Sequence, residues 1–261
     1  MELKNRDKKL EAFGRLLQVM EDLRAGCPWD QKQTWESLRH LTIEEVYELG
    51  DAILEGNHEE VKKEIGDLFL HLVFYSKIGE EKEQFDVADV LNSICEKLIY
   101  RHPHIYGDVE VADEEEVKAN WEKLKLKEGK KSVLEGVPQS LPAMVKAQRI
   151  QEKARGVGFD WDHEGQVWSK VEEELKEFKT ACDTQGFDDQ LAELGDLFFS
   201  LINYARFKDL NPEEALERTN KKFIRRFMYL ENAIRENGQS WDDMSLSEMD
   251  VYWDEAKAKG L

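Results

Sequence analysis

Two stretches of the sequence carry the same pattern of five carboxylates, and each member of the second lies 129 positions after its counterpart. The first set is Glu44, Glu45, Glu48, Glu64 and Asp67, and the second is Glu173, Glu174, Glu177, Glu193 and Asp196. Helical residues three or four positions apart share a face, so each set gathers its acids between two consecutive helices. Crowded carboxylates repel one another unless a cation neutralises them. The pattern therefore predicts a metal site that occurs twice.

The predicted ligands are all carboxylates, which favours Mg²⁺, with Mn²⁺ as a substitute, over zinc or copper. In each set the best geometry belongs to four residues, namely Glu45, Glu48, Glu64 and Asp67 in the first and Glu174, Glu177, Glu193 and Asp196 in the second. A helical di-iron site is the obvious competitor, but it needs two Glu-x-x-His repeats. The chain offers Glu55-x-x-His58 at a predicted helix break, which disfavours iron.

Basic and tryptophan pairs repeat alongside the acids, each at a spacing of four residues. The first half carries Lys97 with Arg101 and Trp121 with Lys125, and the second carries Lys222 with Arg226 and Trp253 with Lys257. Cations near a metal site can clamp phosphate oxygens that the metal also holds. Ordinary surface ion pairs and core tryptophans are the alternative interpretation.

The two halves differ one helical turn before the acids. Lys170 precedes Glu174 in the second half, whereas Leu41 occupies the equivalent position in the first. This lysine would contact phosphate in the second half alone, which favours the second site as the working one. A plain surface lysine is the competing interpretation.

Gly66 and Gly195 lie inside the acidic segments, although glycine costs a helix about 1 kcal/mol relative to alanine. Either a close backbone approach beside the metal or tight helix packing would explain them. The neighbouring Phe198 and Phe199 are expected in the core.

Composition limits the partners of this 261-residue chain. Its formal charge of −19 disfavours nucleic acid and anionic membranes, because polyanion binding requires basic patches. No apolar run is long enough to cross a membrane, and the N-terminus lacks a signal-peptide core. Three separated cysteines without a CxxC pair indicate reduced thiols, so we expect a cytoplasmic protein.

Apolar residues recur at intervals of three and four, which predicts an all-α fold. Helices are expected near 8–24, 42–55, 59–81 and 87–101, and again near 142–155, 167–184, 188–208, 212–237 and 247–259. Gly26 is expected to end the first helix in a left-handed cap, and Thr42 to open the second through a capping box with Glu45. The repeat predicts two helical-bundle domains, at 1–128 and 142–261, joined by a linker at 129–141.

The acidic pattern, in tandem and with two further segments, resembles the MazG family of nucleoside triphosphate pyrophosphohydrolases. The further segments are Gly26-Cys27-Pro28-Trp29-Asp30 and Arg101-His102-Pro103-His104. The resemblance implies Mg²⁺-dependent hydrolysis of a nucleoside triphosphate to the monophosphate and pyrophosphate, by a homodimer whose helical bundles combine both chains. It also implies catalysis in the C-terminal domain, with the nucleotide held by Lys222, Arg226, Trp253 and Lys257.

On this interpretation, Glu173 or Glu174 accepts a proton from the water that attacks the α-phosphorus. Lys170, Lys222 and Arg226 would stabilise the departing pyrophosphate. Trp253 against the base would give broad specificity, suited to nucleotide-pool control. Two alternatives stay open: a narrower enzyme for dUTP, dCTP or a modified nucleotide, and a non-catalytic helical scaffold that binds divalent cations or a regulatory partner.

Overall fold

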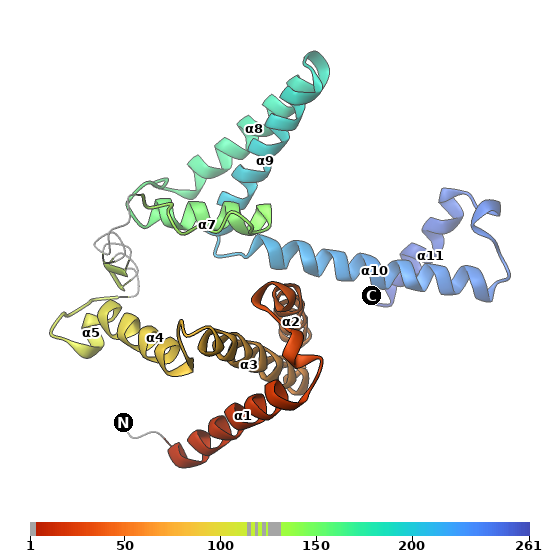
Figure 1. Ribbon diagram of the computed structural model, residues 1–261. Helices are drawn as coiled ribbons and strands as arrows, with labels where there is room; N and C mark the ends of the chain where they lie inside the picture. Colours follow the sequence, from red (N-terminus) through yellow and green to blue (C-terminus); the bar gives the residue numbers. More distant parts are fainter. Residues whose placement is uncertain (1–3, 114–115, 118–119, 122–123, 125–131) are drawn as a thin grey trace. The chain divides into compact units, whose positions relative to one another are not determined.

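The computed structural model describes residues 4–113, 116–117, 120–121, 124 and 132–261, and in these residues all regular structure is helical (Figure 1). The predicted all-α class is confirmed. The chain divides into two compact units, which we call unit 1 (Met1–Glu110) and unit 2 (Val111–Leu261). No helix in the described part is both long and apolar enough to span a bilayer. The predicted domain limits, with a linker at 129–141, stay a prediction.

Unit 1 is built on a pair of antiparallel helices. Its elements are α1 (Arg6–Gly26), α2 (Trp35–Glu55), α3 (His58–Glu81), α4 (Val87–Arg101) and α5 (Pro103–Tyr106). Helix α2 packs along α3, and α1 covers another side of α3. Gly56, at a φ of 67°, and the Asn57 cap make the turn between α2 and α3. The core consists of Met20, Leu38, Val73, Phe74 and Ile78.

Two predicted helix ends in unit 1 are wrong. Helix α2 begins at Trp35 because Thr34 and Ser37 form a reciprocal capping box, so Thr42 lies inside the helix. The Thr42 hydroxyl instead donates to the Leu38 carbonyl at 3.1 Å. Gly26 needs no left-handed conformation, since α1 ends at an extended Cys27 whose N–H donates to the Leu23 carbonyl.

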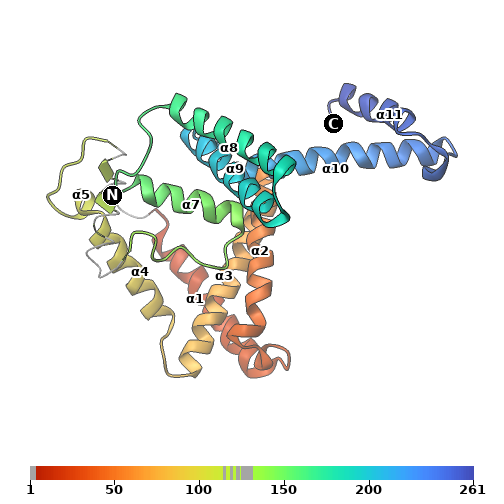
Figure 2. The same cartoon turned by 90° about the horizontal axis from the view of Figure 1, so that it is seen from above.

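Unit 2 contains two helical hairpins (Figure 2). Its elements are α7 (Ala143–Arg155), α8 (Glu164–Thr184), α9 (Phe187–Phe207), α10 (Pro212–Glu236) and α11 (Leu246–Ala258). Helices α8 and α9 form the first hairpin and α10 and α11 the second, while α7 packs against α9. Asn211 caps α10 with Pro212 in its first turn, and Ser245 with Glu248 caps α11. These bounds agree with the predicted helices within a few residues.

Candidate functional site

The α8–α9 hairpin brings the second acidic set together. Carboxylate oxygens of Glu173, Glu174 and Glu177 lie within 4.8 Å of one another, and so do those of Glu174, Glu193 and Asp196. Glu174 belongs to both groups and is 6 % exposed, so it occupies the centre of one continuous cluster. Adjacent turns of α8 and α9 therefore converge as their spacing predicts.

The cluster carries unfavourable charge density. Burial raises the pKa of Glu193, and the neighbouring carboxylates of Glu177, Asp196 and Glu174 raise it further. A divalent cation would relieve both costs, since it neutralises the charge and binds the oxygens. The donor set consists of carboxylate oxygens, which suits Mg²⁺ or Mn²⁺, so these residues fit the metal that the sequence predicts.

Lys170 lies at the edge of the cluster. Its Nζ is 2.7 Å from carboxylate oxygens of both Glu173 and Glu174. The hydrogen bonds to Glu173 and then Glu174 raise the pKa of Lys170, so its ammonium stays charged. The lysine thus offers a fixed positive charge one turn from the predicted metal ligands.

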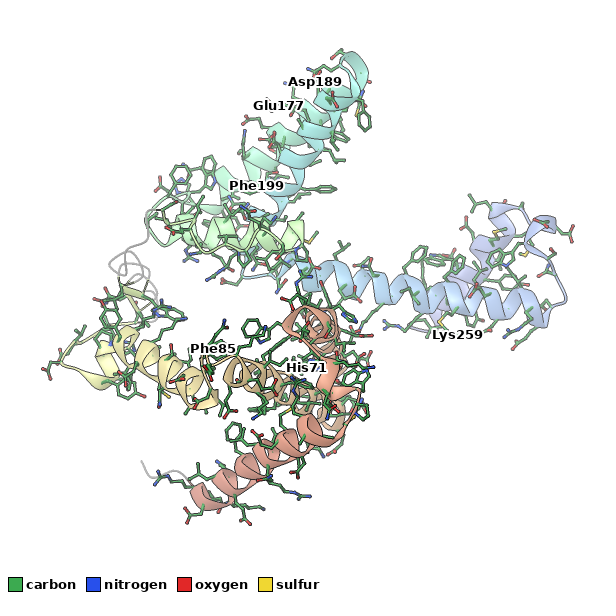
Figure 3. All side chains as sticks on the ribbon, in the orientation of Figure 1. His71, Phe85, Glu177, Asp189, Phe199 and Lys259 are labelled. Carbon is green, nitrogen blue, oxygen red and sulfur yellow. The ribbon has the colours of Figure 1, made fainter. Side chains whose placement is uncertain are left out.

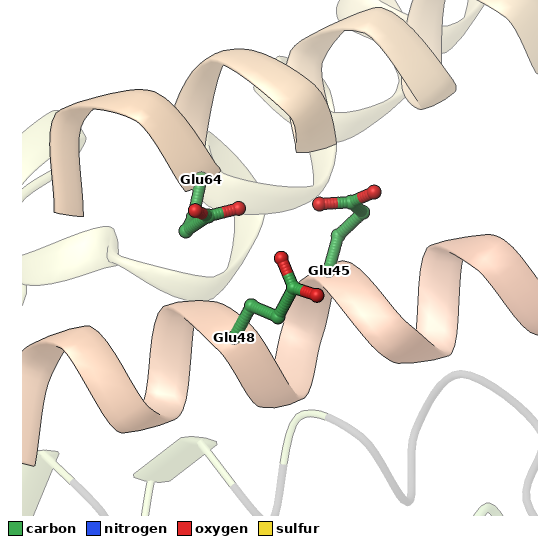
Figure 4. Close-up of side chains that lie close together, drawn as sticks. All are labelled: Glu45, Glu48 and Glu64. Carbon is green, nitrogen blue, oxygen red and sulfur yellow. The ribbon is translucent and has the colours of Figure 1, made fainter. Parts of the chain in front are cut away.

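Unit 1 repeats the cluster between α2 and α3. The carboxylates of Glu45 and Glu48 point from α2 toward Glu64 on α3, and their oxygens lie within 4.8 Å (Figure 4). Glu64 is 3 % exposed and its Oε1 pairs with Lys63 at 3.0 Å, while Oε2 has no hydrogen-bond partner among the described residues. Burial raises the pKa of Glu45, with further contributions from Asp67, Glu48 and Glu64. Such a buried, partnerless oxygen is consistent with a cation ligand.

Of two sequence expectations about these hairpins, one stays a prediction in part and the other is wrong. A Cβ added at Gly66 or Gly195 would meet no described atom within 4 Å, so packing within one chain does not require glycine there, and a close backbone approach beside a metal stays a prediction. The expectation that Phe198 and Phe199 lie in the core is wrong, because their side chains are 54 % and 43 % exposed.

Apart from Lys170 on α8, the predicted nucleotide-binding residues of unit 2 lie on the other hairpin, α10–α11. Arg226 donates from Nε to the Leu261 carbonyl at 2.6 Å, and its guanidinium lies 5.9 Å from the Trp253 ring centre. Lys257 pairs with Asp254, and Lys222 is exposed. The hairpin therefore brings Arg226 and Trp253 together, and among the described residues the acidic groups of unit 2 come from α8 and α9 alone. Their predicted contact with nucleotide stays a prediction.

The corresponding basic and tryptophan residues of the first half do not form a described cluster with its acids. Lys97 is exposed on α4, and Arg101 ends that helix. Trp121 is half-buried, and Lys125 lies outside the residues that the structure describes. Glu44 is exposed on α2 and is absent from the described cluster of three glutamates.

A cavity of about 820 Å³ adjoins the acidic cluster of unit 2. Lys170, Glu174 and Asp196 line it at the cluster. The remaining walls are mostly apolar and come from α7, α9 and the segments around them. They include Val133, Leu134, Ile150, Gln151, Val157, Phe159, Trp161, Phe199, Asn203 and Arg206. Figure 3 shows Phe199 near the end of α9 that α7 crosses, whereas Glu177 lies nearer the tip of the hairpin. The volume falls within the range of small-molecule pockets.

The equivalent positions of unit 1 are filled by its core. At the 129-residue offset, Lys170, Phe199 and Asn203 correspond to Leu41, Leu70 and Phe74. Phe74 is 2 % exposed in the core, and Leu41 and Leu70 pack against that core. Unit 1 therefore keeps the acids but fills with apolar side chains the space that unit 2 leaves open.

Comparison with known proteins identifies the family. The family model of the MazG nucleotide pyrophosphohydrolase domain matches residues 33–106 and 165–229, which contain both acidic sets. The chain belongs to the MazG family. The resemblance inferred from its motifs is thus confirmed, as is the tandem repeat.

Relatives match this MazG-family chain over nearly its full length. The Thermotoga maritima nucleoside triphosphate pyrophosphohydrolase/pyrophosphatase MazG is 42% identical, over 94% of this chain and 95% of that protein. The Escherichia coli (strain K12) nucleoside triphosphate pyrophosphohydrolase is 38% identical, over 97% and 99% respectively. The uncharacterized protein YabN of Bacillus subtilis is 45% identical over 94% of this chain, which spans 51% of that protein.

One wall of the cavity in this MazG-family chain is fixed by an ion pair. Both Nη atoms of Arg206 donate to Asp160, at 3.0 and 2.5 Å, and the two side chains are 6% and 19% exposed. Arg206 also donates to Asn203 Oδ1 at 2.8 and 3.0 Å. The pair ties the loop that carries Phe159 and Trp161 to α9. The sequence pattern did not reveal it, because the two residues are 46 positions apart.

The Asp160–Arg206 pair predicts how acid affects the stability of unit 2. Burial alone would raise the pKa of Asp160, but hydrogen bonds from Arg206 and the Trp161 backbone, with nearby positive charge, lower it overall. A lowered folded-state pKa stabilises the fold above the ordinary aspartate value of about 4, and this contribution is lost as pH falls through the folded-state pKa. We therefore expect Asp160→Asn to destabilise at pH 7 and to differ progressively less from wild type below about pH 4. Urea denaturation from pH 7 to pH 3 would measure this, and a constant difference would contradict it.

Proposed function

We propose that this chain is a Mg²⁺-dependent nucleoside triphosphate pyrophosphohydrolase that releases a nucleoside monophosphate and pyrophosphate from cytoplasmic nucleotide pools. The observation that supports it best is the acidic cluster of α8 and α9 at the edge of a cavity large enough for a nucleoside. Membership of the MazG family and the names of its relatives agree with this reaction.

The residues of the α8–α9 cluster would have three different roles in hydrolysis. A metal ion bound by Glu174, Glu177, Glu193 and Asp196 would neutralise the triphosphate and polarise its phosphorus–oxygen bonds. Glu173 is an exposed member of the cluster outside the four predicted metal ligands, and there it would accept a proton from the attacking water. Glu174 would serve in the same way if Glu173 does not. Lys170 would stabilise negative charge on the departing pyrophosphate.

We propose that hydrolysis takes place in unit 2. In unit 1 the positions that correspond to the cavity residues Lys170 and Asn203 hold Leu41 and Phe74, which pack in the core. The first set of acids, in particular Glu45, Glu48 and Glu64, would then hold a divalent cation without accepting a nucleoside.

Product analysis tests the reaction itself. Incubation with ATP or dUTP and Mg²⁺ is expected to yield monophosphate and pyrophosphate, and EDTA is expected to remove at least about 99% of the activity because the acids alone cannot neutralise the triphosphate. Chromatography of the nucleotides with a pyrophosphate assay measures both products. Diphosphate with phosphate would show attack at a different phosphorus. Absence of turnover would favour the cation-binding scaffold.

We expect the enzyme to accept several bases, because the walls of the cavity are mainly apolar and aromatic and such surfaces bind any base. Values of kcat/KM for ATP, CTP, GTP, UTP and dUTP should fall within about a hundredfold. Parallel assays of the five substrates decide this. A larger preference for dUTP or dCTP would favour the narrower alternative.

We also propose that the protein works as a homodimer. Exposed apolar residues follow one another along α10, namely Phe223, Ile224, Phe227 and Met228, and such surfaces are typical of interfaces. Arg226 and Trp253 lie on α10–α11, apart from the acids on α8–α9. A second copy would therefore bring its α10–α11 hairpin to the acidic cluster, where Lys222, Arg226, Trp253 and Lys257 would contact the nucleotide.

A further inference from the structure

Asn203 brings to the cavity of unit 2 a hydrogen-bond donor that the chemistry above does not use. Four cavity residues of α9, namely Asp196, Phe199, Asn203 and Arg206, recur at intervals of three and four. Helical residues at such spacing share a face, so one face of α9 lines the cavity from the acidic cluster to the Asp160–Arg206 ion pair. Asn203 lies on that face, with cavity residues before and after it.

The neighbouring arginine fixes the orientation of the Asn203 amide. Nε and Nη2 of Arg206 both donate to Oδ1 of Asn203, at 3.0 and 2.8 Å. A guanidinium offers donors and no acceptor, so the atom that faces it must be the amide oxygen. The nitrogen, Nδ2, therefore lies at the other end of the amide, away from Arg206.

Nδ2 of Asn203 is available to a ligand. It donates to no residue that the structure describes. Unlike Oε1 of Gln151, which is closed off in the wall, Nδ2 keeps surface that is accessible to solvent. Because the acceptor of the amide is already occupied, the side chain offers the cavity an oriented donor and nothing else.

The repeat supplies an internal comparison. Phe74 lies 129 positions before Asn203, and it is 2 % exposed in the core of unit 1. The hairpin shared by the two units therefore does not require an amide at this position. The donor accompanies the open cavity of unit 2.

The position of Asn203 along α9 suits the base of a nucleotide rather than its phosphates. Asn203 follows Asp196 by seven residues, which is about 10 Å along the axis of a helix. A nucleotide spans a similar distance between its α-phosphate and the far edge of its base. Phe159, Trp161 and Phe199, whose rings are suited to contact a base, line the same cavity.

We propose that Asn203 is a specificity-determining residue, whose Nδ2 donates a hydrogen bond to the Watson–Crick edge of the bound base. The contact falls at the exocyclic group or at the adjacent ring nitrogen, where oxo bases differ from amino bases. This inference rests on the proposed function of unit 2. A single hydrogen bond biases the enzyme between bases without excluding any of them.

Uracil and cytosine have opposite hydrogen-bonding character at both of these positions. Uracil carries an acceptor, O4, beside a donor, N3–H, whereas cytosine carries a donor, its 4-amino group, beside an acceptor, N3. Guanine and adenine differ in the same way at position 6 and at N1. A protein group that changes from donor to acceptor must therefore alter the preference within each pair, whichever of the two atoms it contacts.

Asn203→Asp makes this change with little alteration of shape. The carboxylate keeps one oxygen for Arg206 and places a second oxygen where Nδ2 stood. We expect the ratio of kcat/KM for UTP to that for CTP, and the ratio for GTP to that for ATP, each to change by at least about tenfold from wild type. A fall in the UTP-to-CTP ratio would assign the wild-type contact to the exocyclic group, and a rise would assign it to the ring nitrogen. The added charge acts on all four triphosphates alike, so it cancels from each ratio.

Two more variants complete the experiment. Asn203→Leu removes the donor without adding an acceptor, so its ratios should move in the same direction by a smaller factor, and it decides the question if the aspartate variant does not fold. Asn232→Asp is the matched control, because Oδ1 of Asn232 also accepts from an arginine three residues later, Arg235. Asn232 is exposed on α10 and does not line the cavity, so its variant should keep the wild-type ratios.

The outcomes separate this inference from the proposed function. Both substrates of a pair are assayed on the same preparation, so each ratio is independent of how much enzyme is folded. An unchanged UTP-to-CTP or GTP-to-ATP ratio in the Asn203 variants would overturn the role of Asn203 and indicate that Nδ2 binds water or the sugar. Failure of wild type to release pyrophosphate from these triphosphates would instead overturn the proposed function itself, and the role of Asn203 with it.

Discussion

Replacement of Glu193 by glutamine is expected to lower kcat by about 10³-fold while the protein stays folded. The change keeps the shape of the side chain and removes one charge from the cluster that it forms with Glu174 and Asp196. Relief of the mutual repulsion that raises the pKa of Glu193 should leave stability unchanged or slightly increased. Pyrophosphate release measures the activity, and thermal unfolding measures the stability.

Two further variants serve as controls for the Glu193→Gln result. Glu172→Gln alters a carboxylate on α8 that bonds Trp168 and lies outside the described cluster, so near-normal activity is expected. Glu64→Gln makes the corresponding change in unit 1 and should cost much less activity than Glu193→Gln. A larger loss from Glu64→Gln would place the working site in unit 1 and contradict our proposal.

Two inactive variants are expected to restore activity when they share a dimer. Glu193→Gln removes an acid from α8–α9, and Arg226→Ala removes a cation from α10–α11, so each homodimer should have less than about 1% of wild-type activity. If each site combines the acids of one chain with the cations of the other, a mixed dimer holds one intact site. Random assembly at equal amounts then gives about a quarter of wild-type activity. Co-expression with two different tags allows this measurement.

The matched control pairs Glu193→Gln with Glu174→Gln. Both changes affect the same hairpin, so every site in the mixed dimer carries one defect and no recovery is expected. No recovery with Arg226→Ala would show that one chain supplies the whole site. Recovery in this control would show that Glu174 and Glu193 of one working site come from different chains, and would contradict the cluster as described. A stable monomer in sedimentation at micromolar concentration would remove the dimer altogether.

The acidic clusters and most helices were predictable because helical periodicity is local. Residues three or four positions apart share a face whatever the rest of the chain does, so Glu193 and Asp196 could be paired from their spacing alone. The start of α2 could not be predicted in the same way. Thr34 and Thr42 could each cap a helix, and the reciprocal hydrogen bonds between Thr34 and Ser37 decide for Thr34.

The cavity could not be predicted from helical periodicity, because it depends on how side chains from separate segments pack against one another. Its walls come from separate segments, and Phe199 has the same helical spacing whether it faces a core or a pocket. A signal did exist in the comparison of the repeats. Where unit 1 has the buried Phe74, unit 2 has Asn203, and an apolar-to-polar change at a packed position indicates a site that has opened.

The filled core of unit 1 and the open cavity of unit 2 also imply different responses to substrate. A ligand that binds only the folded state adds its binding free energy to stability, in proportion to the logarithm of its concentration. Unit 2 gives up internal packing for ligand space, so its resistance to unfolding should rise and fall with the nucleotide supply. Unit 1 carries its own packing and should be indifferent to that supply. Turnover of the protein in the cell would then follow the abundance of its substrate through one half of the chain.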